Sequence, residues 1–121
     1  MGEPSIARTA RIFRALGEPA RIRLVARLAQ GEACVTELAA LEGESLTVIS
    51  QRLRVLRADN IVGHRRKGKH LLYYLSDQHV LDLVFNALAH ASEQYSDKSS
   101  QFAPDGALER TSTNVKSAPN S

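Results

Sequence analysis

Two helix-length segments between residues 34 and 60 are separated by the tight-turn sequence Glu42-Gly43-Glu44. Ser45 follows the turn in the position of a helix N-cap, because its hydroxyl can accept a bond from a free backbone N–H of the next helix. The second segment, which Asn60 closes, carries a stripe of apolar residues at intervals of three and four: Leu46, Ile49, Leu53 and Leu56. A short helix, a turn and a second helix with one buried stripe predict a helix-turn-helix.

The opposite face of the second predicted helix is polar. In a helix-turn-helix the second helix enters the major groove, where hydroxyl, amide and guanidinium groups can bond to base edges or phosphates. We therefore expect DNA contacts from Ser45, Thr47, Ser50, Gln51 and Arg54. The alternative for the two helices alone is an ordinary helical hairpin with a soluble face.

A basic β-hairpin directly follows and favours the winged form of the motif. Residues 61–66 and 70–75 are rich in β-branched and aromatic side chains, and Gly68 between them supplies the positive φ of a tight turn. Although the chain carries only +3 overall, the segment from Arg52 to Lys69 has seven basic residues and one acidic residue. This clustering is typical of nucleic-acid binding, with a solvated charged face as the alternative. The cations expected to reach the DNA backbone or a neighbouring groove are Arg65, Arg66, Lys67 and Lys69.

The flanking segments complete a small, mainly helical domain. Helical spacing predicts helices over residues 5–16 and 19–31, and a last helix that Ser76 caps and that ends near Tyr95. The fold class is therefore mainly α with a small β-hairpin, about five helices in a winged helix-turn-helix. Residues 1–95 form the domain, and the polar residues 96–121 are predicted to be a disordered tail.

Composition and length indicate where in the cell the protein is located and whether it associates with a second subunit. No apolar run approaches the ~20 residues of a membrane span, and no secretory signal precedes residue 20. The single cysteine fits a reducing compartment, so we expect a cytoplasmic protein that does not enter a membrane. A chain of 121 residues buries a modest core, which makes a partner subunit a reasonable expectation.

The last predicted helix carries two pairs of metal-competent side chains, Asp77 with His79 and His90 with Glu93. The two histidines are eleven residues apart. In a helix this spacing brings their side chains to within ~20° of the same direction, so they share one face, but it separates them by ~16 Å along the axis. One zinc ion with ligands at ~2.0–2.3 Å cannot span that distance. Two antiparallel copies of the helix can supply Asp77 and His79 from one subunit and His90 and Glu93 from the other.

This donor set suits tetrahedral Zn²⁺, with Co²⁺ as an alternative. The four residues could instead be polar side chains on an exposed helix face, with no metal bound. No His-Glu-x-x-His, Gly-x-Ser-x-Gly or Gly-rich phosphate loop occurs, so we do not expect an enzyme.

The run "ACVTELAALEGESLTVISQRLRVLRADNIVGHRRKGKHLLYYLSDQH" resembles the ArsR/SmtB metal-sensing repressors, and the upstream "ALGEPARIRLVARL" is similar to that family's second helix. The resemblance covers roughly residues 6–95. One departure is Gln51, where many members carry His, and it affects the expected operator sequence. The metal pattern matches the Asp-x-His…His-x-x-Glu signature of zinc-sensing members with a site on the last helix.

The resemblance implies a repressor that binds double-stranded operator DNA as a homodimer, joined through its first and last helices. Zinc binding at sites between the subunits would release the DNA. The alternative is a winged-helix DNA-binding regulator of the same fold whose signal is not a metal, or whose metal site is vestigial.

Overall fold

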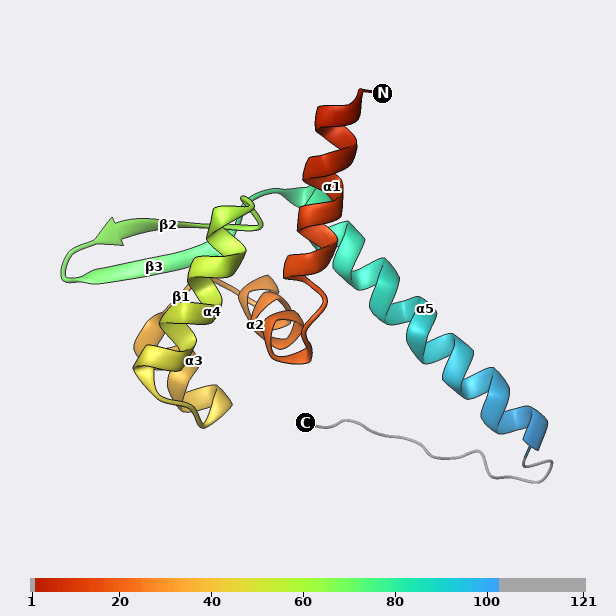
Figure 1. The fold of residues 1–121 in the computed structure, drawn as a ribbon. Helices are drawn as coiled ribbons and strands as arrows, with labels where there is room; N and C mark the ends of the chain where they lie inside the picture. Colours follow the sequence, from red (N-terminus) through yellow and green to blue (C-terminus); the bar gives the residue numbers. More distant parts are fainter. Residues whose placement is uncertain (1, 103–121) are drawn as a thin grey trace. The chain divides into compact units, whose positions relative to one another are not determined.

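The computed structural model describes residues 2–102 of the chain, and the side chains of residues 2–93. Its elements follow in the order α1 (Glu3–Ala15), α2 (Pro19–Ala29), β1 (Ala33–Cys34), α3 (Val35–Glu42), α4 (Leu46–Ala58), β2 (Val62–Lys67), β3 (His70–Leu75) and α5 (Gln78–Phe102) (Figure 1). The chain divides into two units, Met1–Val84 and Phe85–Ser121, and α5 begins in the first and continues in the second.

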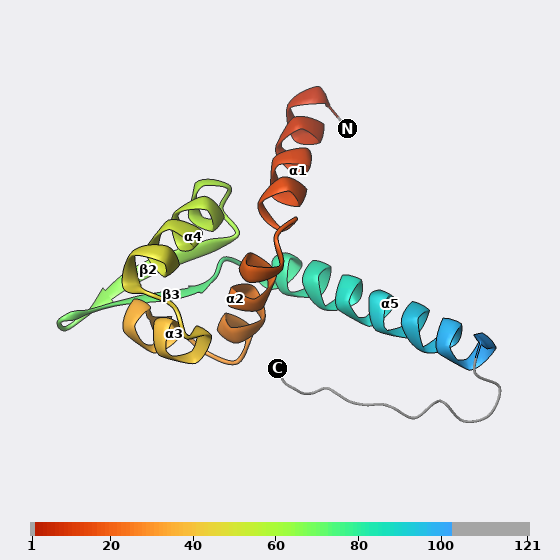
Figure 2. The same cartoon turned by 60° about the horizontal axis from the view of Figure 1, so that its bottom comes forward.

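The winged helix-turn-helix and its five helices are as the sequence predicts. The β-hairpin, however, belongs to a three-stranded antiparallel sheet of order β1-β3-β2. The additional strand, β1, pairs Ala33 with Tyr73 and Cys34 with Leu72. Two residues are too few to show the alternating pattern of a strand, so β1 could not be predicted from periodicity. In both views of the ribbon, the tip of the β2–β3 hairpin projects beyond the neighbouring helices (Figures 1 and 2).

The predicted turn residues set the helix boundaries. Gly43 adopts φ 67° after α3, a left-handed conformation that favours glycine, and the N–H of Glu44 returns to the carbonyl of Ala39. The hydroxyl of Ser45 then caps α4 by accepting a bond from the N–H of Val48 at 3.1 Å. Gly68 turns the hairpin with φ 61°.

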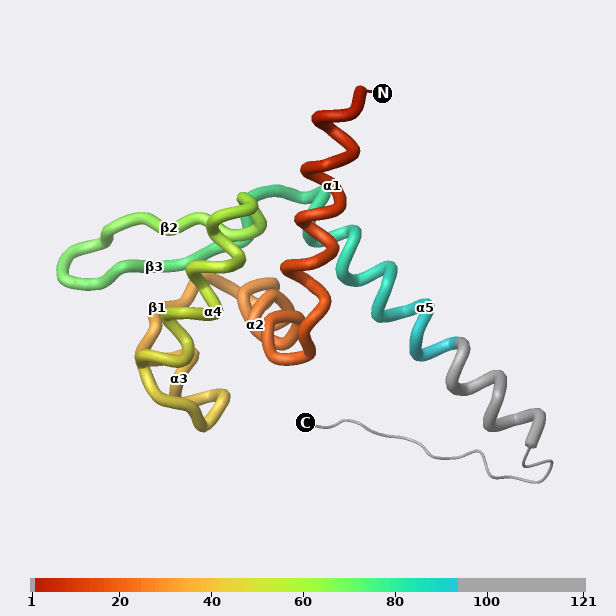
Figure 3. Tube along the Cα trace, viewed as in Figure 1, coloured from red at the N-terminus to blue at the C-terminus, as the bar shows by residue number. Residues whose placement is uncertain are grey.

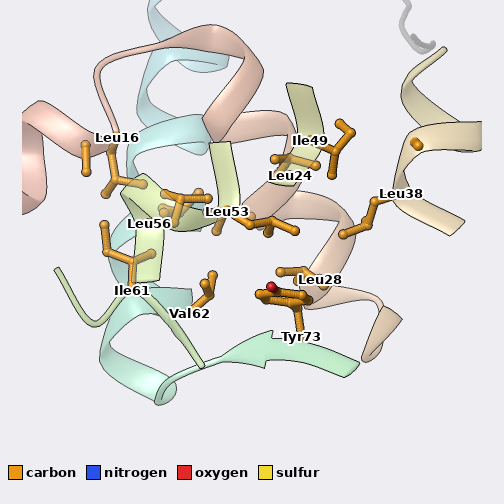
Figure 4. Close-up of a cluster of buried hydrophobic side chains, with 14 residues drawn as sticks. Leu16, Leu24, Leu28, Leu38, Ile49, Leu53, Leu56, Ile61, Val62 and Tyr73 are labelled. Carbon is orange, nitrogen blue, oxygen red and sulfur yellow. The ribbon is translucent and has the colours of Figure 1, made fainter. Parts of the chain in front are cut away.

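The core of the first unit joins α1, α2, α3, α4, the hairpin and the start of α5 (Figure 4). Its largest fully buried side chains are Leu24, Leu38, Ile49, Leu53, Leu56, Ile61, Val25 and Val62. The buried stripe of α4 begins at Ile49, and the prediction that Leu46 is buried is wrong, because its side chain is 54% exposed. Leu46 is the first residue of α4, beyond the end of the packed stripe.

The hairpin leads directly into α5, as the chain trace shows (Figure 3). The helix extends to Phe102, past the end predicted near Tyr95, so residues 96–102 are helical instead of belonging to an irregular tail. Residues 103–121 of the predicted tail lie outside the described residues. Among the described residues, no helix combines the length and apolar character needed to cross a membrane.

Candidate nucleic-acid interface and metal ligands

The outward face of α4 brings together three of the predicted DNA-binding residues. Thr47, Gln51 and Arg54 are exposed and stand at intervals of four and three, which places them on one side of the helix. Ser50, by contrast, is half-buried. The hydroxyl of Ser45 is engaged in capping α4, so this residue has a structural role at the start of the helix.

The four predicted cations of the hairpin, Arg65, Arg66, Lys67 and Lys69, are all exposed around its tip. The register pairs Arg65 with Leu72, Arg66 with Leu71 and Lys67 with His70. Because side chains alternate along a strand, Arg65 and Lys67 share one face of the hairpin and Arg66 lies on the other. Positive charge therefore surrounds the tip on both faces.

Two basic residues of the segment from Arg52 to Lys69 form ion pairs with acidic residues that precede the segment in the sequence. The guanidinium of Arg65 lies 2.5 Å from the carboxylate of Glu32, and that of Arg52 lies 3.4 Å from Glu44. The first pair is 33 residues apart in the sequence, so no local spacing could have revealed it. The local charge count therefore overstates the free positive charge of the segment.

Glu42 holds the helix-turn-helix against α2. Its side chain is only 5% exposed and pairs with Arg23, at 3.1 Å, and with Arg27. Arg27 also donates to the carbonyl of Leu41 at 3.2 Å. Burial alone would raise the pKa of the Glu42 carboxyl, but the hydrogen bonds and charges of the two arginines outweigh it and hold the pKa below its usual value. The end of α3, and hence the turn before α4, is thereby fixed to α2.

The first pair of predicted metal ligands lies at the start of α5. Oδ1 of Asp77 accepts a bond from the N–H of Val80 at 3.0 Å, so Asp77, and not Ser76 as predicted, caps this helix. Nδ1 of His79 lies 3.9 Å from the same Oδ1, and the His79 side chain is 96% exposed. Two ligands of one tetrahedral zinc are about 3.4 Å apart. A small side-chain rotation would therefore let Asp77 and His79 bind the same ion.

The second pair, His90 and Glu93, lies on the continuation of α5, and both side chains are exposed. Their separation of three residues makes them neighbours along the helix surface. Among the described residues of a single chain, no three His, Cys, Asp or Glu side chains gather into a metal site. The chain thus presents two incomplete pairs of zinc-competent donors.

Comparisons with known proteins agree with this architecture. Residues 18–63 match the family described as "Bacterial regulatory protein, arsR family". The chain is 40% identical over 84 residues to a transcriptional repressor SmtB homolog of Synechocystis sp., a match that covers 69% of this chain and 64% of that protein. It therefore spans slightly less than two thirds of that relative. It is also 35% identical to a cadmium resistance transcriptional regulatory protein CadC homolog of Staphylococcus aureus, over 69% of this chain and 70% of that one.

A solved structure shares the same fold. It is the homodimeric winged helix-turn-helix DNA-binding domain of Mb0332 from Mycobacterium bovis, with a TM-score of 0.72 and 28% identity. The superposition covers 77% of this chain and 89% of that one. On the fold and on these relatives, the chain belongs to the ArsR/SmtB family of winged helix-turn-helix transcriptional regulators, which are not enzymes.

Proposed function

We propose that this protein is a metal-responsive transcriptional repressor that binds operator DNA as a homodimer and is released when zinc binds between its subunits. The observation that carries the proposal is the placement of two exposed donor pairs, Asp77 with His79 and His90 with Glu93, along α5. Neither pair alone can complete the four-coordinate shell that zinc prefers in proteins.

The DNA-binding part of the proposal rests on α4 and the hairpin. Thr47, Gln51 and Arg54 form an exposed polar face on the second helix of the motif, the one that enters the major groove in such proteins. Double-stranded DNA is the partner that suits this face and the basic hairpin tip, because its phosphates attract clustered cations. The relatives named as transcriptional repressors and as a DNA-binding domain support this part.

The dimer part rests on exposed apolar side chains of α1 and α5. On α1, Ile6 is 46% and Phe13 55% exposed, and on α5, Phe85 is 42% and Leu88 37% exposed. Apolar side chains at helical spacing on a surface are expected to be covered by a partner. A second copy is the partner we propose, joined through its first and last helices, since the Mb0332 domain is homodimeric.

Zinc is the ion we propose, with cobalt as a substitute, because two imidazoles and two carboxylates suit tetrahedral coordination. Antiparallel α5 helices would place Asp77 and His79 of one subunit beside His90 and Glu93 of the other, giving two sites per dimer. The relative named for cadmium resistance supports a metal signal in general. When bound, zinc would supply a rigid link between the subunits.

Release cannot come from charge alone. Each Zn²⁺ adds two positive charges, which should strengthen attraction to the DNA polyanion. The release we propose is therefore conformational: linking the two α5 helices fixes the angle between subunits, so that the two α4 helices no longer match half-sites one helical turn apart. By linkage, bound DNA must weaken zinc binding by the same factor.

The test is a zinc titration of the 121-residue protein bound to a duplex that the protein has itself selected from a randomised pool. We expect DNA release with two zinc ions per dimer, loss of that release in His90→Ala, and unchanged zinc-free DNA affinity. Asn86→Ala, an exposed change on the same helix, is the matched control. If zinc does not change the affinity for DNA, the proposed zinc sensing is wrong. The protein would then be a winged-helix regulator with another signal, or one whose metal site is vestigial.

A further inference from the structure

One of the four hairpin cations differs from the others in its surroundings. The Nη2 atom of Arg65 on β2 donates to Oε1 of Glu32 at 2.5 Å, while both side chains remain partly exposed, at 50% and 39%. Among the described residues, no ion pair engages Arg66, Lys67 or Lys69. Arg65 thus already has an anionic partner, and the three cations nearer the turn do not.

The pair bridges the sheet. Glu32 directly precedes β1, and β1 and β2 lie on opposite sides of β3. Neighbouring strands are about 4.8 Å apart, so the two outer strands are separated by about twice that distance. The long Arg65 side chain spans this gap across β3 and ties the hairpin to the segment that leads into α3.

Resting on the proposed DNA-binding function, we infer that Arg65 is a positioning residue that holds the hairpin through Glu32, and that the phosphate contacts of the hairpin come from Arg66, Lys67 and Lys69. An Arg65 bound to Glu32 forms a pair with no net charge and releases no counterions on meeting DNA. If Arg65 turned to a phosphate instead, it would lose a charge-assisted hydrogen bond and leave Glu32 unpaired near the polyanion.

The salt dependence of DNA binding separates the two roles. The logarithm of the association constant falls linearly with the logarithm of the salt concentration, by about 0.9 for each phosphate neutralised. Lys67→Gln should therefore make the slope shallower by about 0.9 per subunit. The double variant Glu32→Gln/Arg65→Gln removes both charges of the pair and leaves the net charge unchanged, so it should lower affinity by a similar factor at every salt concentration and leave the slope unchanged. Glu32→Gln should make the slope steeper, by up to about 0.9 per subunit, because Arg65 becomes free to bind a phosphate.

The experiment measures binding of the 121-residue protein to its selected duplex by fluorescence anisotropy between about 50 and 300 mM KCl, the range over which counterion release changes affinity strongly. The exchanged variant Glu32→Arg/Arg65→Glu should regain the affinity lost in Glu32→Gln/Arg65→Gln, because it restores the pair with its polarity reversed. Melting temperatures of all variants check that the fold is kept.

Two outcomes would overturn the inference: a slope that becomes shallower in Glu32→Gln/Arg65→Gln by as much as in Lys67→Gln, or an exchanged variant that binds no better than Glu32→Gln/Arg65→Gln. The proposed function fails in a different way, through unmodified protein that shows no salt-dependent binding to any duplex. The two failures are therefore distinguishable in one set of titrations.

Discussion

Oδ1 of Asp77 and the backbone N–H of Val80 are joined by a hydrogen bond of 3.0 Å. Asp77 therefore caps α5 in addition to its proposed role as a zinc ligand. These roles can be separated, because Asn caps a helix as well as Asp does, whereas Ala does not. Asp77→Ala should cost about 1 kcal/mol of unfolding free energy and Asp77→Asn only a fraction of that, measured by urea denaturation.

Zinc affinity, unlike stability, should fall in both Asp77→Ala and Asp77→Asn. Both variants lose the carboxylate, so both should bind zinc more weakly in competition with a chelator. Asp82→Asn, a change at an exposed position of α5 outside the proposed donor set, provides the control. Zinc affinity in Asp77→Asn equal to that of the unmodified protein would remove this residue from the proposed site.

The carboxylate of Glu42 should make the stability of the protein depend on pH in the acidic range. Its pKa in the folded state lies below the usual value of 4.5, because the bonds from Arg27 and Arg23 outweigh the effect of burial. A group whose pKa is lowered on folding stabilises the protein above its unfolded pKa, and this stabilisation is lost as pH falls through the folded value. Glu42→Gln should therefore cost about 1–3 kcal/mol at neutral pH and progressively less below pH 4.5.

Glu37 contributes in the same direction and must be considered in that comparison. The backbone N–H of Cys34 donates to Glu37 at 2.9 Å and lowers its pKa as well, so some acid sensitivity should persist in Glu42→Gln. Urea denaturation from pH 7 to pH 3 measures both effects, with Glu18→Gln, at an exposed position, as the matched control. A constant difference between Glu42→Gln and the unmodified protein across this range would contradict the assignment.

The ring of Tyr74, which pairs with Gly63 across β2 and β3, occupies the space that a β-carbon at position 63 would need. A β-carbon at Gly63 would lie 2.8 Å from both Cζ and Oη of Tyr74, closer than real contacts allow. In Gly63→Ala the ring must swing away, at a cost of about 1 kcal/mol. The same substitution in a Tyr74→Leu background should cost much less, since the clashing atoms are gone. Equal costs in the two backgrounds, measured by urea denaturation, would show that the ring is not responsible.

Local signals in the sequence were enough to predict the helix-turn-helix and the hairpin. The turn at Gly43 with its cap at Ser45, and Gly68 in the hairpin, each act on backbone atoms within a few residues. Such signals do not depend on the rest of the fold, so they can be identified before it is known.

Features that depend on distant residues could not be predicted in this way. The pairing of Arg65 with Glu32 and the short strand β1 exist only because β3 lies between two edge strands. Leu46 fits the spacing of a buried stripe, yet its exposure is decided by where the core ends. The donor pairs of α5 show the same limit, because their spacing can be read along one chain, whereas the site we propose also needs residues of a second subunit.

The proposal that zinc binds between subunits predicts a specific behaviour of mixed dimers. One subunit carries Asp77→Asn and His79→Ala, and the other carries His90→Ala and Glu93→Ala. Neither homodimer contains a complete site. In the mixed dimer, one site receives its four natural ligands, two from each subunit, and the other site receives none of them. We therefore expect one zinc ion per mixed dimer, bound with the affinity of the unmodified protein.

Mixed dimers can be purified with a different affinity tag on each subunit, and zinc can be measured by chelator competition and by metal analysis. The unmodified dimer, carrying the same two tags, provides the reference of two ions. If each site were formed within one chain, every subunit of the mixed dimer would lack two ligands, and tight zinc binding would be absent. Recovery of one site thus depends on α5 of one subunit facing the opposite end of α5 of the other, because ~16 Å of helix separates His79 from His90 in either chain alone.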